Sequence, residues 1–155
     1  MIDAENARYD IGHVWRTTGY PTLALRFVTP SYQHRFTFAL DGQEKLFSET
    51  FEKVRYRELD MPSVIQVNDS DVTSTGTIWI RQSDGTVGRT SVNFKTPLGM
   101  SISITTDFSK DTKLGLWLPL RMQERYDELS GDATTCLASY SHFRRFETSG
   151  RLIIQ

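Results

Sequence analysis

Strict alternation of apolar and polar side chains is the feature of this sequence that most limits its fold. The clearest segment, residues 100–108, reads MSISITTDF, with apolar residues at most even positions and polar residues at most odd ones. Successive side chains of a strand point to opposite faces, so this segment has one apolar and one solvated face. Such a pattern is typical of an antiparallel sheet with one side packed on a core.

Other segments indicate strands of the same kind, separated by turn residues. Asp41-Gly42 predicts a hairpin turn after one strand, and Gln82 to Gly85 a second turn. Residues 45–58 read as one long strand or two short ones, with a basic stripe on one face made of Lys53, Arg55 and Arg57. Residues 121–129 fit either helical or strand spacing. The remaining segments predicted as strands are residues 23–28 (between Pro21 and Pro30), 35–40, 77–81, 86–94, 116–122 and 134–146.

These segments predict an all-β or β-dominated fold with about eight strands and no long helix. The composition agrees, because Thr, Val and Ile together number 35 while Ala numbers 6. We expect a strongly curved antiparallel sheet, a half-barrel or an incomplete barrel. A parallel α/β sheet is excluded, since it needs crossover helices. We expect residues 1–155 to form a single β-domain, in which residues 1–12 are a weakly ordered leader and Asp3 caps a short helical turn through Arg8.

Composition also narrows the function. The net charge is −1, which argues against a dedicated nucleic-acid binder. No apolar stretch is long enough for a transmembrane helix, and the first 30 residues lack the apolar core of a signal peptide. The single cysteine, Cys136, excludes an intrachain disulfide and a cysteine-rich zinc site, and we expect it to be a buried thiol in a strand.

Motifs of catalysis and cofactor binding do not occur in the sequence, so we expect no enzyme, no metal and no cofactor. His13, His34 and His142 lack metal-ligand spacing, and residues 68–71 (NDSD) read as a solvated turn rather than a calcium loop. No nucleophile elbow, phosphate loop or dinucleotide fingerprint is present. The alternative is a hydrolase whose site is assembled across strands.

The C-terminal third carries a family resemblance. Residues 113–122 read KLGLWLPLRM, Glu124 to Tyr126 read ERY, and residues 138–146 read ASYSHFRRF. This resembles the ending of a family of uncharacterised secreted bacterial proteins, LGLWVPVxMxExY followed by ATYSNFRRF. His142 stands where that pattern has Asn. Residues 19–25 and the hairpin around Trp79 and Gly85 match as well, so the likeness runs from about Asp10 to Phe146.

Those proteins are in turn similar to the LolA/LolB-like fold of outer-membrane lipoprotein sorting. The resemblance implies a curved half-barrel whose apolar concave face holds acyl chains and whose helices cover that face. It also implies a periplasmic or secreted location. Without the resemblance, the missing signal peptide would lead us to expect a cytoplasmic protein. This chain lacks the secretion signal, the opening strands and the covering helices of that fold. Relative to that family, we expect Met1 to be a misplaced start or the chain to be an N-terminally truncated part of a longer secreted protein.

The leading functional expectation is non-enzymatic binding of a lipid, acyl chain or lipidated protein in the cell envelope. Nine apolar residues would line the concave face: Phe36, Phe38, Leu40, Ile78, Ile80, Ile102, Ile104, Leu118 and Leu120. Two alternatives remain open. The same residues could form a filled core, because an alternating strand looks the same in both cases. The protein would then be a structural or interaction module that adds a partner strand at an exposed sheet edge.

Overall fold

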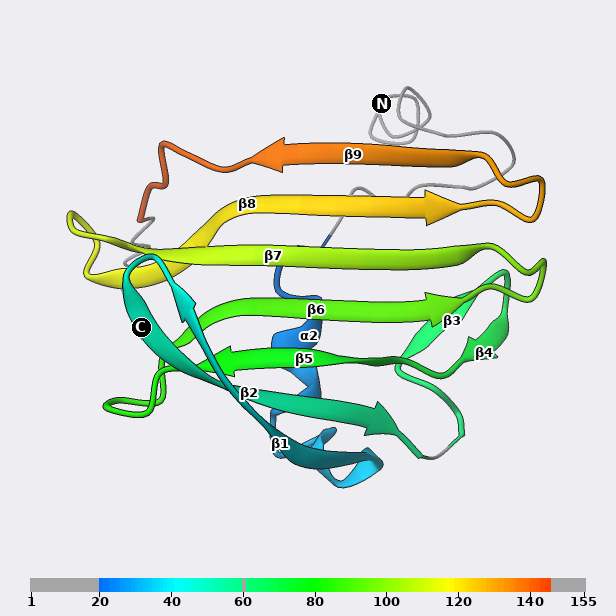
Figure 1. Ribbon diagram of the computed structural model, residues 1–155, viewed down its shortest axis with the longest axis horizontal. Coiled ribbons are helices and arrows are strands. Elements are labelled where there is room, and N and C mark those ends of the chain that lie inside the picture. Colours follow the sequence, from blue (N-terminus) through cyan, green and yellow to red (C-terminus); the bar gives the residue numbers. More distant parts are fainter. Residues whose placement is uncertain (1–19, 60, 146–155) are drawn as a thin grey trace, which may run out of the picture.

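The computed structural model describes residues 20–59 and 61–145 as a mostly β fold with little helix (Figure 1). A short α-helix, α2 (Leu23–Phe27), and a 3-10 turn, η2 (Gln33–Arg35), precede the strands. The strands that follow are β1 (Phe36–Leu46), β2 (Glu49–Glu58), β3 (Ile65–Val67), β4 (Ser70–Val72), β5 (Thr75–Ile80), β6 (Val87–Lys95), β7 (Ser101–Asp111), β8 (Leu116–Asp127) and β9 (Ala133–Ser139).

Seven of these strands form one antiparallel sheet in the order β1-β2-β5-β6-β7-β8-β9. The other two, β3 and β4, pair as a small hairpin inserted between β2 and β5. Within the described residues β1 and β9 do not pair, so the sheet is open and its edges are β1 and β9. The predicted β-rich, antiparallel, incompletely closed architecture is confirmed.

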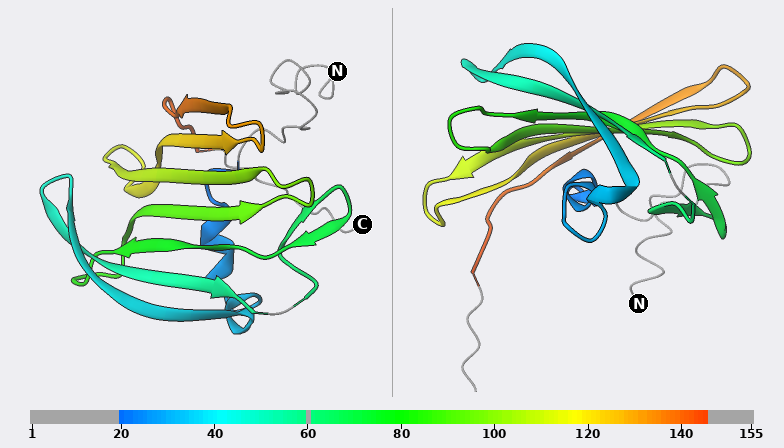
Figure 2. Two further views of the ribbon diagram at one scale, coloured as in Figure 1. Left: turned by 45° about the vertical axis from the view of Figure 1, so that its right-hand side comes forward. Right: turned by 90° about the horizontal axis from the view of Figure 1, so that it is seen from below.

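Helix α2 lies against one face of the sheet, as Figure 2 shows from below. The prediction of a strand at residues 23–28 is therefore wrong. Ala24 and Phe27, three residues apart, are the buried positions of the segment, which is helical spacing. Phe27 is fully buried, stacks on Phe36 at 4.7 Å between ring centroids and meets Tyr56 edge-on at 5.4 Å. These ring contacts outweigh the strand preference of a short apolar run between two prolines.

The hairpin predicted at Asp41-Gly42 is also wrong. Strand β1 continues through this dipeptide as a bulge, in which Asp41 and Gly42 together face Lys53. Gly42 has φ of 81°, a value that glycine adopts at no steric cost. The chain reverses five residues later at Phe47 and Ser48, both with positive φ. Asp-Gly fits a bulge as well as a turn, so the dipeptide alone does not distinguish them.

The remaining strand predictions hold with shifted ends. Residues 121–129 resolve as strand, since β8 reaches Asp127, while the last strand stops at Ser139 instead of Phe146. Asn68 and Asp69 form the exposed turn between β3 and β4, as expected of a solvated loop. Cys136 lies on edge strand β9 and is half-buried rather than buried, because no strand of the sheet covers its outer side. The leader of residues 1–12 lies outside the described residues.

The two faces of the sheet differ sharply in character. The face toward α2, here called the helix-covered face, carries Tyr56, Ile78, Val92 and Ile104 on successive strands. The opposite face, here called the open face, carries a directly paired row of exposed or half-exposed polar residues: Arg57, Thr75, Asn93, Ser103 and Arg125. Among the described helices, none is long and apolar enough to cross a membrane.

Candidate functional site

Six of the nine residues predicted to bind an apolar ligand share the helix-covered face. Phe36 and Ile78 belong to the core cluster together with Ala24 and Phe27 of α2. Phe38, Ile80 and Ile104 pack against that cluster, and Ile102 is buried on the same face. These six residues share one face of the sheet, and α2 packs against the cluster at its centre.

The other three predicted residues lie apart from this cluster. Leu40 sits on edge strand β1 with 72% of its surface exposed. Leu118 and Leu120 lie at the start of β8, beside a bulge that leaves Leu120 unpaired with β7. They line a groove of about 450 Å3 with Tyr140 and Phe143, next to the end of β9. The single apolar surface expected from the alternation is therefore split by the edge and the bulge.

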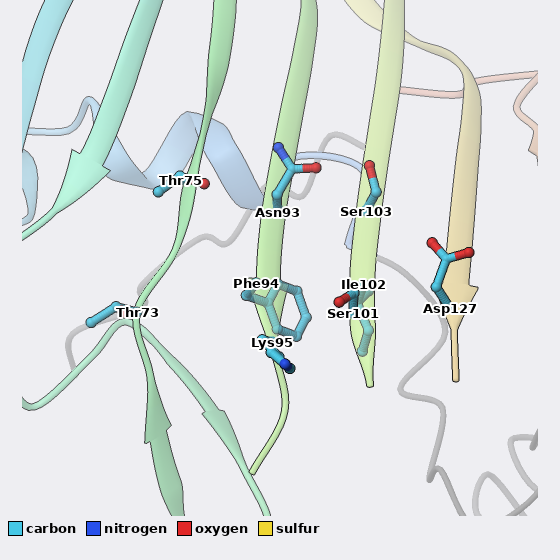
Figure 3. A pocket seen from close by; sticks show the side chains of 9 residues that line it. All are labelled: Thr73, Thr75, Asn93, Phe94, Lys95, Ser101, Ile102, Ser103 and Asp127. Carbon is cyan, nitrogen blue, oxygen red and sulfur yellow. The ribbon is translucent and has the colours of Figure 1, made fainter. Parts of the chain in front are cut away.

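Two further grooves lie mainly on the open face and share Thr75 and Asn93. One, of about 500 Å3, is lined by residues of β1, β2, β5 and β6 that include Arg55 and Arg57. The other, of about 460 Å3, is shown in Figure 3, where Asn93, Ser103 and Asp127 come from adjacent strands β6, β7 and β8. Hydroxyl, amide and charged groups contribute to the lining of both grooves.

Charged residues on the open face are largely paired with one another. Asp107 is buried and accepts hydrogen bonds from Arg89 Nε at 2.6 Å and Arg121 Nη2 at 2.7 Å. In the predicted basic stripe, Lys53 and Arg55 both contact Asp41, at 3.8 and 3.2 Å. These ion pairs connect neighbouring strands, so each of these charges has a partner within the sheet. They therefore read as structural contacts rather than as catalytic groups.

The two edges of the sheet are built very differently. Edge strand β1 contains the Asp41-Gly42 bulge and the charged residues Asp41, Glu44 and Lys45. Edge strand β9, of sequence ATTCLAS, has no charge and no proline, and pairs with β8 over seven residues without a register shift. Bulges, charges and prolines are the devices by which natural sheets prevent strand addition at an edge. In the part of the chain that the structure describes, the β1 edge has two of these devices and the β9 edge has none.

One backbone hydrogen bond at the end of β9 fixes which of its backbone groups point outward. Tyr140 N donates to Leu120 O at 2.9 Å, one residue beyond the Ser139–Arg121 pair. That pair is therefore non-hydrogen-bonded, and Ser139 directs its N–H and C=O away from β8. Alternation along β9 gives the same outward direction to Leu137, Thr135 and Ala133. We call these four residues the outward β9 residues.

The outward β9 residues also present their side chains to solvent. All four are exposed, and Leu137 has 71% of its surface accessible. The sequence predicted the strand but not its place at the edge, because alternation of apolar and polar residues does not predict the order of strands in a sheet. The available signal was local: residues 133–143 contain no Asp, Glu, Lys or Arg.

Metal and acid–base chemistry have little support in the described part of the chain. No group of three or more His, Cys, Asp or Glu side chains that could hold a metal ion occurs among the described residues. Burial, and secondarily the charge of Glu58, raises the pKa of the Tyr56 phenol far above its usual value, but its hydroxyl already donates to Ser91 O at 2.7 Å. The Arg81 guanidinium holds the pKa of the Asp84 carboxyl well below its usual range, in the β5–β6 turn.

Comparison with protein families, characterised proteins and solved structures finds no match to this chain. Among the described residues, the sheet combines a covered apolar face, a polar open face and one edge without a bulge, charge or proline.

Proposed function

We propose that this protein is a non-enzymatic interaction module that binds an extended protein segment by strand addition to β9. The observation that carries the proposal is the contrast between the two edges of one sheet. The β1 edge is protected by a bulge and by charge, whereas the β9 edge is regular, uncharged and exposed. An unprotected edge is a template for pairing with another chain.

The outward β9 residues offer a partner strand eight backbone groups, one N–H and one C=O from each of four residues. An extended segment pairing with them would continue the antiparallel ladder of the sheet. Side chains of such a segment would alternate between the two faces. Those on the open face would meet Thr135 and Leu137, so the exposed leucine would bury its side chain on binding. Backbone bonds would supply affinity and the neighbouring side chains would supply selectivity.

Selection from a phage-displayed library of short random peptides tests this proposal. We expect selected peptides to lose binding to the Leu137→Lys variant, because a charged edge residue opposes strand addition. Leu129→Lys is the matched control, since Leu129 is 77% exposed but lies in the turn between β8 and β9. Peptides that bind both variants equally, or a selection that yields no binder, would overturn the proposal.

A second proposal keeps the apolar-ligand function on the helix-covered face. It is favoured by the continuity of apolar residues across that face, from Phe36 on β1 to Ile104 on β7. The packing of Phe27 against this face weighs against it. The Ile104→Trp variant separates the two cases. A cavity would accept the larger ring and lose fatty-acid binding, whereas a packed core would be destabilised by about 1–3 kcal/mol.

Thermal melts of that variant, and titration of the wild type with a fluorescent fatty acid, measure both effects. Because Phe27 packs against this face, we expect destabilisation by about 1–3 kcal/mol and no fatty-acid binding at micromolar concentrations. Saturable fatty-acid binding that Ile104→Trp abolishes at little cost in stability would instead establish the carrier function.

The relationship to the LolA/LolB-like proteins, and with it an envelope location, also stands as a proposal. An open antiparallel sheet with a helix against one face supports it. Fractionation of the source cells with an antibody against this chain tests the location. Recovery in the periplasmic or secreted fraction is expected, and recovery in the cytoplasm alone would contradict it.

A further inference from the structure

We infer that the segment bound at the β9 edge is β9 of a second copy of this chain, so that two sheets join into one continuous sheet about a twofold axis. The inference rests on the proposed function and goes further by naming the partner. An antiparallel pair of identical strands is its own symmetric complement, and twofold contacts are the commonest arrangement of homo-oligomers.

Only one register satisfies every outward group of β9. Outward residues must pair with outward residues, so Ala133, Thr135, Leu137 and Ser139 pair among themselves. When Thr135 lies opposite the partner's Leu137, Ala133 lies opposite the partner's Ser139, and all four outward residues of each copy find partners. A slip of two residues in either direction leaves one outward residue of each copy unpaired. The fully paired register is therefore the most favourable one.

The side chains of β9 are compatible with self-pairing. The strand carries no charge, so two copies meet without electrostatic repulsion. On the open face, Leu137 of each copy lies opposite the partner's Thr135, which brings an exposed leucine against a β-branched side chain. The charged β1 edge lacks this property, since its own bulge and its Asp41, Glu44 and Lys45 would disturb the ladder.

In this register the twofold axis passes midway between Cys136 and the partner's Cys136. Cys136 is paired with Glu124 of β8 and directs its backbone groups inward, so it would face the partner's Cys136 as a non-hydrogen-bonded pair. Such pairs have Cα atoms about 4.5 Å apart, within the range of about 4.4–6.8 Å that a disulfide accepts. The natural cysteine therefore reports the register directly.

A pair of seven-residue strands buries little surface compared with the roughly 1,200 Å2 of a stable interface. We therefore expect a weak dimer, which sedimentation at rising concentration detects and covalent trapping preserves. Diamide is the trapping oxidant: its azo group accepts the two electrons and two protons released when two thiols form one disulfide.

The experiment compares three proteins under the same dilute conditions. Wild type should form a disulfide-linked dimer at least tenfold faster than the Cys136→Ser/Leu129→Cys variant, although position 129 is the more exposed. The Leu137→Lys variant keeps Cys136 but should lose most of both the crosslinking and the concentration-dependent sedimentation. Equal crosslinking at positions 136 and 129, together with a monomer at all concentrations, would overturn the inference.

That failure remains distinguishable from failure of the proposed function. If selected peptides bind wild type and not Leu137→Lys while the protein stays monomeric, the edge binds strands but not its own copy. If neither peptide binding nor dimerisation depends on Leu137, strand addition at β9 is wrong altogether.

Discussion

Tyr56 shows how one side chain connects three parts of the molecule. Its ring packs against Phe27 of α2, and its hydroxyl donates to Ser91 O on β6, across the short strand β5. Gly76 lies between them, because any Cβ at that position would collide with the Ser91 carbonyl and the Tyr56 hydroxyl. The glycine thus makes room for a hydrogen bond that joins strands two places apart in the sheet.

The raised pKa of Tyr56 makes a prediction about alkaline stability. The unfolded phenol ionises near pH 10, whereas the buried one stays neutral well above it. Its contribution is therefore complete below about pH 10 and is lost above it, by about 1.4 kcal/mol per pH unit. Tyr56→Phe should cost about 1 kcal/mol at neutral pH and show a shallower alkaline loss. Urea unfolding from pH 8 upward measures both, and parallel pH profiles would contradict the assignment.

Glu58 is a second residue that connects separate parts of the fold. Its buried carboxylate accepts hydrogen bonds from Val64 N at 2.7 Å and from Ser74 N and Oγ, both at 3.1 Å. It thereby ties the β3–β4 excursion to the end of β2. Glu58→Ala should destabilise the fold by about 3 kcal/mol, because it leaves buried donors without an acceptor. Glu58→Gln should cost less, and denaturant titrations giving equal losses for both would show that the acceptor oxygens are unimportant.

At the scale of elements, alternation predicted the sheet well and failed where the chain leaves it. Residues 100–108 and the Trp79–Gly85 hairpin were correct because their strands have one buried and one solvated face. The strand predicted for residues 23–28 was wrong because two buried positions, Ala24 and Phe27, do not distinguish helix from strand in so short a segment. The contact of Phe27 with Phe36 decides the outcome. Of the candidate site, β9 was predictable as a strand, but its place at the edge follows from strand order alone.

The orientation of β9 makes a prediction with a built-in control. Thr135→Pro removes an outward N–H, which no described strand pairs, so the fold should melt within a few degrees of wild type. Thr134→Pro removes an inward N–H bonded toward β8 and should destabilise by about 3 kcal/mol. Thermal melts compare the two variants. A larger loss for Thr135→Pro would reverse the assigned direction of the β9 backbone.

At the scale of the whole molecule, the sheet has three surfaces that differ in what covers them. The helix-covered face is packed by α2, the open face carries grooves and paired charges, and the β9 edge has backbone groups that no described strand pairs. A strand added at β9 would extend both faces without disturbing the core. Binding is therefore expected to leave α2 and its ring contacts unchanged, in agreement with the largely rigid docking of preformed sheets.

Amide hydrogen exchange along β9 tests this account most directly. In the dilute protein, the amides of the inward residues Thr134, Cys136 and Ala138 should be protected, and those of Ala133, Thr135, Leu137 and Ser139 should exchange freely. Adding a selected peptide, or raising the concentration of the protein itself, should protect the second set without altering the first. Outward amides that are already protected in the dilute monomer, or that never become protected, would contradict strand addition at β9.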